Sequence, residues 1–436
     1  MGTQNNRRNF LKTTGLMATL PLTNGFGQSK TSTLVETAGS SGSLKLSKVT
    51  PYVIQTAPPH WGGRYWYFVR LETDNGLVGW GETAILGALN GLQKSYKSII
   101  REAFAYYLEG KNPLDRDFLY QKLVKGMTHQ HADYVTMGII SAFDVAMWDI
   151  VGKHYNTPVY NLLGGLYRNR VRTYTYIYDT VNMDDARETI RDWTSQPEYV
   201  AENAVRLVNE GFTALKFDPT PQLRDGGNIA PPWELSMAEY DHAERAVAAV
   251  REAVGTEADI LIGTHGQITP SAAKRLAARI EKYDPLWLEE PCPPRNFKEM
   301  GEIARSTKIP IATGERLVSI FEFQNVFTQG GCAFANPDLG SCGGITACKK
   351  IAILAEANYV LMAPHVWGGP IITAAAQQIC ANVPNFLVQE SIYKSGGFFD
   401  EVLVEPFIWD NGDLVVTDRP GIGIELDEKK LDKYKI

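Results

Sequence analysis

The sequence of 436 residues lacks several features that would assign it to a specialised class of protein. It contains no run of eighteen apolar residues, so we do not expect a membrane-embedded chain. Its five cysteines have no metal-site spacing, and we expect buried, inert thiols in preference to a disulfide. The formal net charge of −6 argues against nucleic acid or an anionic membrane as a partner. With 44% hydrophobic residues the chain should form a soluble globular protein, and its length suits a barrel plus a second domain.

The N-terminal segment, residues 1–43, has the pattern of a targeting sequence followed by a linker. Arg7 and Arg8 precede Phe10-Leu11-Lys12 and a mildly apolar stretch, which resembles a twin-arginine export signal. Residues 25–43 are rich in Gly, Ser and Thr, as linkers are. The alternative is an unstructured basic start. We expect a bacterial periplasmic protein whose first 43 residues contribute nothing to the fold.

Residues 44–170 predict a separate α+β domain. Three strand-like runs come first, with Asp74-Asn75-Gly76 as a hairpin turn, and three helical segments follow. The last helix carries apolar residues on more than one face, so it should be buried, and we expect structural roles for Asp144 and Asp149 within it. The strands are expected at 47–55, 65–73 and 77–83, and the helices at 91–108, 113–125 and 137–153.

From residue 171 to residue 391 the chain alternates strand-like and helix-like segments. A unit of about 25 residues is typical of a (β/α)8 barrel, in which active-site residues lie at the C-terminal ends of the strands. Residues 392–436 follow this region, and Asp410-Asn411-Gly412-Asp413 there predicts a hairpin. The apolar runs of the repeat end, at steps of about 25 residues, at Gly263, Glu289, Glu315, Asp338, His365 and Glu390.

The residue types at these strand ends indicate a cation site beside acid–base groups. Glu289 and Glu315 would point into the mouth of the barrel, where charges cannot stay buried without a counter-ion. Asp338 and His365 lie on neighbouring strand ends and can form a dyad in which the carboxylate orients and charges the imidazole. Lys216 ends an earlier strand. The alternative is that both glutamates form structural ion pairs with lysines or arginines of the barrel.

Taken together, these runs resemble the enolase superfamily, and within it the mandelate racemase/muconate lactonizing enzyme subgroup and its galactonate dehydratase-like members. The resemblance implies a modified TIM barrel, (β/α)7β, over residues 171–391, with an N-terminal α+β capping domain over 44–170. Residues 392–436 are expected to pack back on the cap and complete it. A homo-oligomer is also implied. The residues that carry the resemblance are the Lys216 strand, Trp287-Leu288-Glu289-Glu290-Pro291, Thr313-Gly314-Glu315-Arg316, the Asp338/His365 pair and Glu390.

The resemblance also implies a magnesium site. Removing a proton α to a carboxylate leaves an enediolate, which a divalent cation on oxygen ligands stabilises, and carboxylate-only ligation favours Mg²⁺ over zinc. Glu289 and Glu315 would be ligands, with Glu290 out of phase in a supporting role. The family's first ligand, an Asp two residues before His265, is Gly263 here. We expect Asp218 to take the vacant position. Ligation by His265, or a degenerate site, are the alternatives.

The acid–base residues follow from the same resemblance. His365 would be the base that removes the C2 proton, with Asp338 as its orienting carboxylate. His265 would protonate the departing 3-hydroxyl. Lys216 would neutralise or deprotonate on the opposite face, and Glu390 would hydrogen-bond the enediolate or the substrate carboxylate. The cap loop that contains His60 and Trp61 is expected to contact the distal part of the substrate, although an ordinary surface loop is equally compatible with its composition.

These residues predict a Mg²⁺-dependent dehydratase of an aldonic or aldaric acid, with a small acidic sugar as its substrate and a 2-keto-3-deoxy acid as product. Cycloisomerisation of an anhydro or lactone sugar acid needs the same first step, and the sequence does not separate the two. Epimerisation is disfavoured because Asp218 stands where the racemases have a second lysine. Gly263 leaves one non-enzymatic alternative open, a barrel without metal that binds sugar acids.

Overall fold

The computed structural model describes residues 44–58, 60–84, 91–177, 196–221 and 229–436. The expected export signal and linker, residues 1–43, lie outside the described residues. All five cysteines are free and four of them are buried, as expected.

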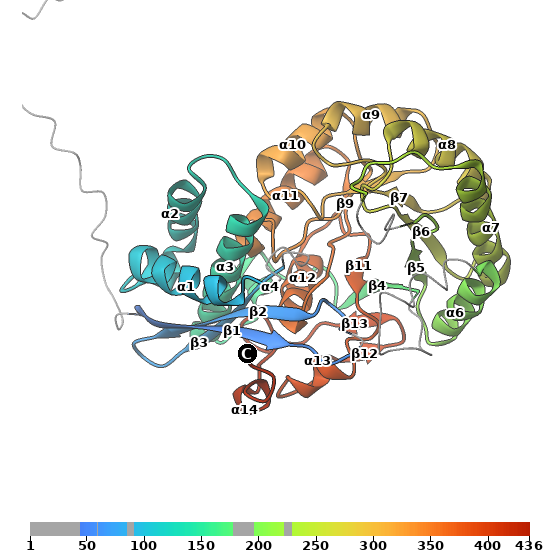
Figure 1. Ribbon diagram of the computed structural model, residues 1–436. Helices are drawn as coiled ribbons and strands as arrows, with labels where there is room; N and C mark the ends of the chain where they lie inside the picture. Colours follow the sequence, from blue (N-terminus) through green and yellow to red (C-terminus); the bar gives the residue numbers. More distant parts are fainter. Residues whose placement is uncertain (1–43, 59, 85–90, 178–195, 222–228) are drawn as a thin grey trace, which may run out of the picture. The chain divides into compact units, whose positions relative to one another are not determined.

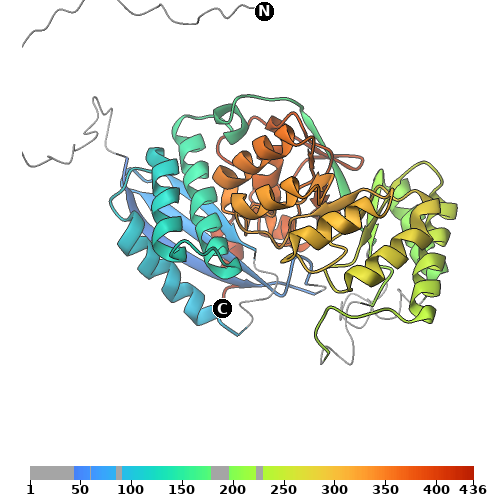
Figure 2. The same cartoon turned by 90° about the horizontal axis from the view of Figure 1, so that it is seen from above.

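The N-terminal domain begins with an antiparallel sheet in which β1 (Leu46–Gln55), β2 (Tyr65–Thr73) and β3 (Val78–Thr83) are paired in chain order. The helices that follow cover one face of this sheet (Figure 2). The expected order of three strands and three helices is therefore confirmed, with two adjustments: a π-helical turn ends the first helix, and the third begins earlier than its sequence pattern indicates. The helices are α1 (Gln93–Ala103), α2 (Arg116–Thr128) and α3 (Tyr134–His154).

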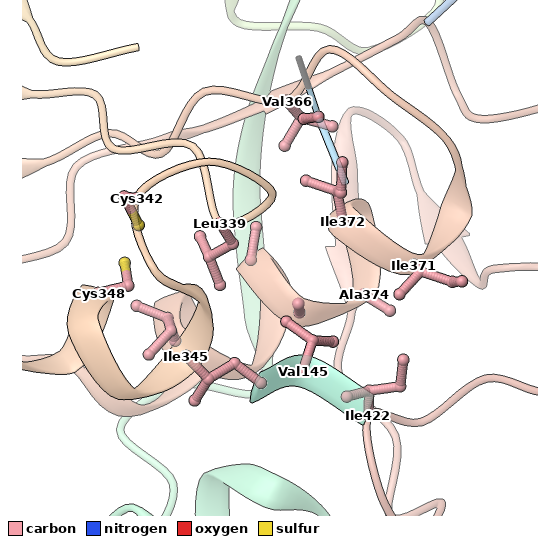
Figure 3. Packing of buried hydrophobic residues seen from close by; sticks show 14 of the residues in the cluster. Val145, Leu339, Cys342, Ile345, Cys348, Val366, Ile371, Ile372, Ala374 and Ile422 are labelled. Atoms are coloured by element: carbon pink, nitrogen blue, oxygen red, sulfur yellow. The ribbon is translucent and has the colours of Figure 1, made fainter. Parts of the chain in front are cut away.

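Helix α3 joins the cap to the barrel. It is long and apolar enough to span a membrane, but most of it is buried within the protein, so it is a core helix. Figure 3 shows Val145 of α3 packed among Ile345, Ala374 and Ile422. The two acidic residues of α3 have the expected structural positions: Asp144 accepts from the Thr346 amide, and Asp149 accepts from the Trp80 and Ile422 amides.

The second domain is a closed barrel of eight parallel strands within the described chain. Closure comes from pairing of β11 with β4 and from a bridge between Met362 and Phe386. Each of the first seven strands is followed by a helix, so the predicted (β/α)7β barrel is confirmed (Figure 1). The strands are β4 (Arg170–Tyr176), β5 (Ala214–Phe217), β6 (Asp259–Gly263), β7 (Trp287–Glu289), β8 (Ile311–Thr313), β9 (Phe334–Ala335), β10 (Leu361–Met362) and β11 (Gln389–Ser391).

Four of the barrel helices begin at a residue whose side chain caps them. Ser236, Thr269, Asn296 and Ser319 each accept a hydrogen bond from a backbone amide in the first turn of a helix, which satisfies a donor that the helix leaves free. Short α4 (Val159–Leu162) leads into β4. The helices of the barrel are α6 (Pro197–Asn209), α7 (Met237–Val254), α8 (Pro270–Ile280), α9 (Phe297–Arg305), α10 (Ile320–Thr328), α11 (Gly344–Ala357) and α12 (Pro370–Asn382).

The interior of the barrel is filled by side chains. Tyr174, Leu261, Trp287 and Val388 form a buried apolar cluster with Ala214, Ala312, Phe334 and Ala363. Such packing closes the lower part of a barrel and leaves its C-terminal mouth as the place for polar groups. Because the eight strands are parallel, the acidic residues at their C-terminal ends lie at this mouth.

The C-terminal tail contacts both domains. The predicted hairpin forms between β12 (Trp409–Asp410) and β13 (Asp413–Val415), and β13 pairs antiparallel with β4 of the barrel. Farther along, beyond α13 (Phe398–Glu401) and α14 (Glu428–Leu431), Lys435 forms a bridge with Ile54 of β1. The tail thus returns to the cap as expected. It also adds β13 to the N-terminal half of β4, next to the part of β4 that pairs with β11.

Candidate active site

The polar strand ends gather at the C-terminal mouth of the barrel. Gly263 on β6 pairs in register with Glu289 on β7, and Asp338 forms a bridge with His365 across the ends of β9 and β10. The charged side chains brought together here are almost completely removed from solvent. None of the following is more than 4% exposed: Lys216, Asp218, Glu289, Glu290, Glu315, Asp338, His365 and Glu390.

This cluster carries an excess of negative charge. Six of its members are carboxylates, while its permanent cations are Lys216 and Arg316 and its imidazoles are His265 and His365. With all six carboxylates ionised and both imidazoles protonated, a charge of −2 remains. A buried charge of that size needs a counter-ion, because an unpaired carboxylate in a low-dielectric interior is costly.

Lys216 on β5 reaches into the middle of the carboxylates. Its Nζ lies 2.5 Å from Glu289 Oε1 and 3.7 Å from Glu390 Oε1. Burial lowers the pKa of Lys216, but Glu289, Glu390 and Glu315 together raise it well above its usual value. The ammonium group therefore remains charged and serves as a fixed cation beside the site.

Arg316 holds the glutamate that was expected to have a supporting role. Its guanidinium contacts one oxygen of Glu290 and one oxygen of Glu315. Glu290 has a left-handed backbone, with φ of 45°, which turns its side chain out of the phase of Glu289. Three carboxylate oxygens in this group are buried without a hydrogen-bond partner: Glu289 Oε2, Glu290 Oε1 and Glu315 Oε2.

The donor set at Glu289 and Glu315 fits a hard divalent cation. Unpartnered carboxylate oxygens and the charge of −2 both favour a cation there. Within the described residues, however, no three ligating side chains are close enough to hold a metal ion. Asp218 contacts His265 and Tyr176, and its assignment as the third ligand beside Glu289 and Glu315 stays a prediction.

Asp218 pairs with His265. Its Oδ2 contacts His265 Nδ1, and its Oδ1 accepts from the Tyr176 hydroxyl at 2.5 Å. Burial raises the pKa of Asp218, but His265 and Tyr176 lower it below its usual value overall. The side chain of His265 is 25% exposed, so the imidazole borders the opening of the site. The Asp218 carboxylate therefore has two partners at the mouth of the barrel, His265 and Tyr176.

His365 and Asp338 form the second imidazole–carboxylate pair, as the sequence predicts. His365 Nδ1 lies 2.6 Å from Asp338 Oδ2, and the Gly340 amide donates to Asp338 Oδ1 at 2.7 Å. His365 Nε2 lies 3.5 Å from Glu315 and 3.6 Å from Glu390. Burial lowers the pKa of His365, but Glu315, Glu390 and Asp338 raise it to about 10.

The cap loop lies against the loops that carry these residues. The Trp61 ring packs on Tyr393, which follows β11, with ring centroids 5.8 Å apart. A Cβ at Gly62 would lie 2.1 Å from the Gly368 carbonyl oxygen, so only glycine permits this approach to the loop after His365. His60 is turned back into the loop, where its Nδ1 lies 2.9 Å from the Thr56 hydroxyl. Trp61 therefore contacts the barrel through Tyr393 while His60 contacts its own loop, and the expected contact of both with substrate stays a prediction.

Two tyrosines of the site were missed by reading the sequence. Tyr176 is the last residue of β4, and its place at a strand end is a signal that could have marked it. Tyr134 begins α3 of the cap and buries its hydroxyl beside Ser341, where burial and then Asp338 and Glu315 raise its pKa well above normal. No local pattern around Tyr134 points to the barrel.

Comparison with known proteins finds relatives along nearly the whole described chain. Residues 48–164 match the mandelate racemase/muconate lactonizing enzyme N-terminal domain, and residues 199–430 match the enolase C-terminal domain-like family. A D-xylonate dehydratase from Haloferax volcanii is 34% identical over 380 residues, 86% of each chain. A D-galactonate dehydratase from Xanthomonas euvesicatoria pv. vesicatoria is 33% identical over 396 residues, 89% of this chain and 94% of that protein.

Solved structures give the same result. A crystal structure described as a mandelate racemase/muconate lactonizing enzyme from Burkholderia SAR-1 has a TM-score of 0.83 and 40% identity, and the match covers 89% of this chain and 94% of that one. Another with the same description, from Labrenzia alexandrii DFL-11, has a TM-score of 0.83 and 39% identity over 90% of this chain and all of that one.

Proposed function

The chain belongs to the mandelate racemase/muconate lactonizing enzyme family of the enolase superfamily, and on this premise we propose that it is a Mg²⁺-dependent dehydratase of an aldonic or aldaric acid. The broader class, a sugar-acid dehydratase and therefore a lyase, rests on dehydratase relatives that are 33% and 34% identical over most of the chain. A periplasmic location and a homo-oligomeric state belong to the same proposal.

One observation carries the proposal: two imidazoles, each on a carboxylate, border a buried group of glutamates with unpartnered oxygens. Elimination of water from a sugar acid needs a base at C2, an acid at the 3-hydroxyl and stabilisation of the negative charge that develops in between. These three requirements correspond to three separate groups at the mouth of the barrel.

The base is His365. Asp338 holds its Nδ1, so Nε2 takes the C2 proton when the imidazole is neutral, and a cation at Glu289 and Glu315 would favour that state by offsetting the carboxylate charge that raises the pKa of His365. When that proton leaves, its electron pair passes into the substrate carboxylate and forms an enediolate. Lys216 and Glu390 flank this position: the ammonium attracts the developing charge, and Glu390 is fixed by the Val366 amide at 2.9 Å. Bound at Glu289 and Glu315, Mg²⁺ would add positive charge beside the enediolate oxygens.

The acid is His265. It gives a proton to the 3-hydroxyl as the C3–O bond breaks, and water leaves. The electron pair of the enediolate then forms the C2–C3 double bond of an enol, which tautomerises to the 2-keto-3-deoxy acid. The His265 imidazole is more exposed than that of His365, which suits a group that protonates the leaving hydroxyl and releases water to solvent.

The test is turnover of a panel of aldonates and aldarates in ²H₂O with Mg²⁺, with ²H at C2 followed by NMR and 2-keto-3-deoxy product by a carbonyl assay. We expect one substrate to give product that depends on Mg²⁺. Deuterium in recovered substrate without product would indicate an epimerase, and isomerisation without loss of water a cycloisomerase. Binding of sugar acids without Mg²⁺ and without turnover would refute the enzymatic proposal. The matched control is His365→Asn, which should give neither exchange nor product.

A further inference from the structure

Three neighbouring positions, Gly263, Asp218 and Tyr176, form an arrangement that the dehydratase proposal does not itself require. They lie on β6, at the end of β5 and on β4, which are adjacent strands in the barrel. Gly263 and Tyr176 both border the carboxylate of Asp218, a residue that is 1% exposed. Their arrangement decides what this buried carboxylate does.

Gly263 creates the space that the carboxylate occupies. A Cβ added at residue 263 would lie 2.1 Å from Asp218 Oδ1 and 3.2 Å from its Cγ. Gly263 is the last residue of β6, and its φ is not in the left-handed region, so its backbone does not demand glycine. The demand comes from the neighbouring side chain. Any larger residue at 263 would push the Asp218 carboxylate away from its present position.

The carboxylate has its two oxygens directed to two different partners. Tyr176 donates to Oδ1 at 2.5 Å, and Oδ2 is left to face Nδ1 of His265. His265 has a left-handed backbone, with φ of 49°, and is followed by Gly266 with φ of 65°. A non-glycine residue in this conformation carries strain, and such strain is commonly found where a side chain must be aimed.

This geometry repeats that of the other imidazole. In both pairs an Asp from the neighbouring strand end faces Nδ1 of the histidine, which fixes Nδ1 as the protonated nitrogen and presents Nε2. The pairs lie on opposite sides of the glutamates, since β5 and β6 precede β7 and β8 in the sheet, and β9 and β10 follow them.

We infer that Asp218 is a positioning residue for His265, and that Gly263 and Tyr176 exist in this chain to hold its carboxylate against Nδ1. The site then contains two opposed imidazole–carboxylate dyads, one for each proton that is moved. This inference rests on the proposed function for its catalytic meaning, but the contact itself concerns only the free protein. It assigns Asp218 to His265 and not to a metal ion.

The first test needs no substrate. In protein labelled with ¹⁵N-histidine, the signals of His265, one of seven histidines, are assigned by their loss in His265→Gln. We expect the Nδ1 signal of His265 to show a strongly hydrogen-bonded proton in the unaltered protein. It should change in Asp218→Asn, where an amide NH₂ can face Nδ1 and favour the other tautomer, and in Gly263→Ala, where the carboxylate is displaced. His365 signals should stay in place in both variants.

The second test distinguishes the role of the Asp218–His265 pair from that of the Asp338–His365 pair. With a turned-over substrate, Asp218→Asn should lower kcat by on the order of 10²-fold, the lower end of what a positioned acid contributes, with little change in KM. It should still exchange the C2 proton with solvent, because His365 is intact. Asp338→Asn is the matched control and should lose both exchange and product. Gly263→Ala should resemble Asp218→Asn, and the double variant should be no worse than either, because both act on one contact.

Several results would overturn the inference. Unchanged His265 signals in Asp218→Asn would show that the carboxylate does not hold the imidazole. Loss of Mg²⁺ binding in a calorimetric titration of Asp218→Asn, with His265 signals unmoved, would make Asp218 a ligand. Additive effects of Gly263→Ala and Asp218→Asn would separate the two positions. If no sugar acid is turned over, the proposed function fails, while the NMR arm still decides the contact.

Discussion

Replacing His365 by asparagine tests the assignment of the base. The imidazole is 4% exposed, with one nitrogen 2.6 Å from Asp338 and the other directed to the space bordered by Glu315 and Glu390. Asparagine can still donate to Asp338 but has no group that accepts a proton. A positioned base contributes roughly 10²–10⁴-fold in rate, which is about 3–5 kcal/mol of activation free energy. We expect kcat to fall by at least this factor.

The fold should tolerate this change. The His365→Asn variant keeps a donor toward Asp338, and the Gly340 amide continues to donate to the other oxygen of that carboxylate. The free energy of unfolding should therefore fall by only ~1–3 kcal/mol, the typical effect of weakening one buried polar contact. Urea unfolding at constant Mg²⁺ concentration measures this term separately from turnover.

The decisive assay is solvent exchange in ²H₂O. Substrate recovered from His365→Asn should contain no deuterium at C2. The matched variant His265→Asn should form little product and yet return substrate labelled at C2, because proton removal and proton delivery are separate steps. If His365→Asn exchanges the C2 proton at the rate of the unaltered enzyme, the assignment of the base is wrong.

Three further predictions concern Arg316, Tyr134 and Glu82, a buried residue of β3 that accepts from the Gly369 and Ile372 amides. Arg316→Met should lower the free energy of unfolding by ~3–5 kcal/mol because Glu290 and Glu315 lose their shared cation. Mg²⁺ should restore part of this stability, and thermal unfolding with and without Mg²⁺ measures the loss and the recovery. A variant as stable as the unaltered protein would contradict the pairing. Burial raises the pKa of Glu82 from 4.5 to about 8, so the folded state binds the extra proton between these values and stability falls as pH rises. Glu82→Gln should remove this contribution of ~1.4 kcal/mol per pH unit from urea unfolding between pH 5 and pH 8, and an unchanged slope would reject it. The Tyr134 hydroxyl is buried near the acidic groups, and we expect it to donate to substrate, so Tyr134→Phe should raise KM about tenfold with unchanged stability. An unchanged KM in steady-state kinetics would exclude that role.

The sequence predicted the positions that depend on strand direction alone. In a parallel barrel, every strand end that follows the repeat must lie at the same mouth, so Glu289, Glu315, Asp338 and His365 could be placed together before any coordinates. The pairing of Asp338 with His365 followed as well, because their strands are consecutive in the chain and adjacent in the barrel.

The partner of Asp218 could not be predicted in the same way. From the sequence, a carboxylate at the end of β5 can reach toward the glutamates or toward the imidazole after β6, and both choices satisfy its charge. The outcome depends on the volume left by one missing Cβ, at Gly263, and on a hydroxyl from β4. Spacing along the chain contains no information about either quantity, so the sequence alone does not choose between a metal-ligand role for Asp218 and its contact with His265.

Tyr134 illustrates a second limit. Its hydroxyl approaches Ser341, and the two residues are separated by more than 200 positions and belong to different domains. Only the docking of α3 against α11, which Asp144 and Thr346 help to fix, brings them together. A periodic pattern identifies α3 as a buried helix, but it does not identify the surface that buries it.

The order of groups across the barrel gives the site its logic. From β5 to β10 the strand ends carry a carboxylate, an imidazole, two glutamates, a carboxylate and an imidazole, so each dyad lies to one side of the glutamate pair. A substrate whose carboxylate is held by Lys216 and by a cation at the glutamates would then have C2 and the 3-hydroxyl between two imidazoles with fixed protonated nitrogens. Because elimination removes one proton and delivers another, two separately oriented imidazoles suit it better than a single one that must exchange roles during the reaction.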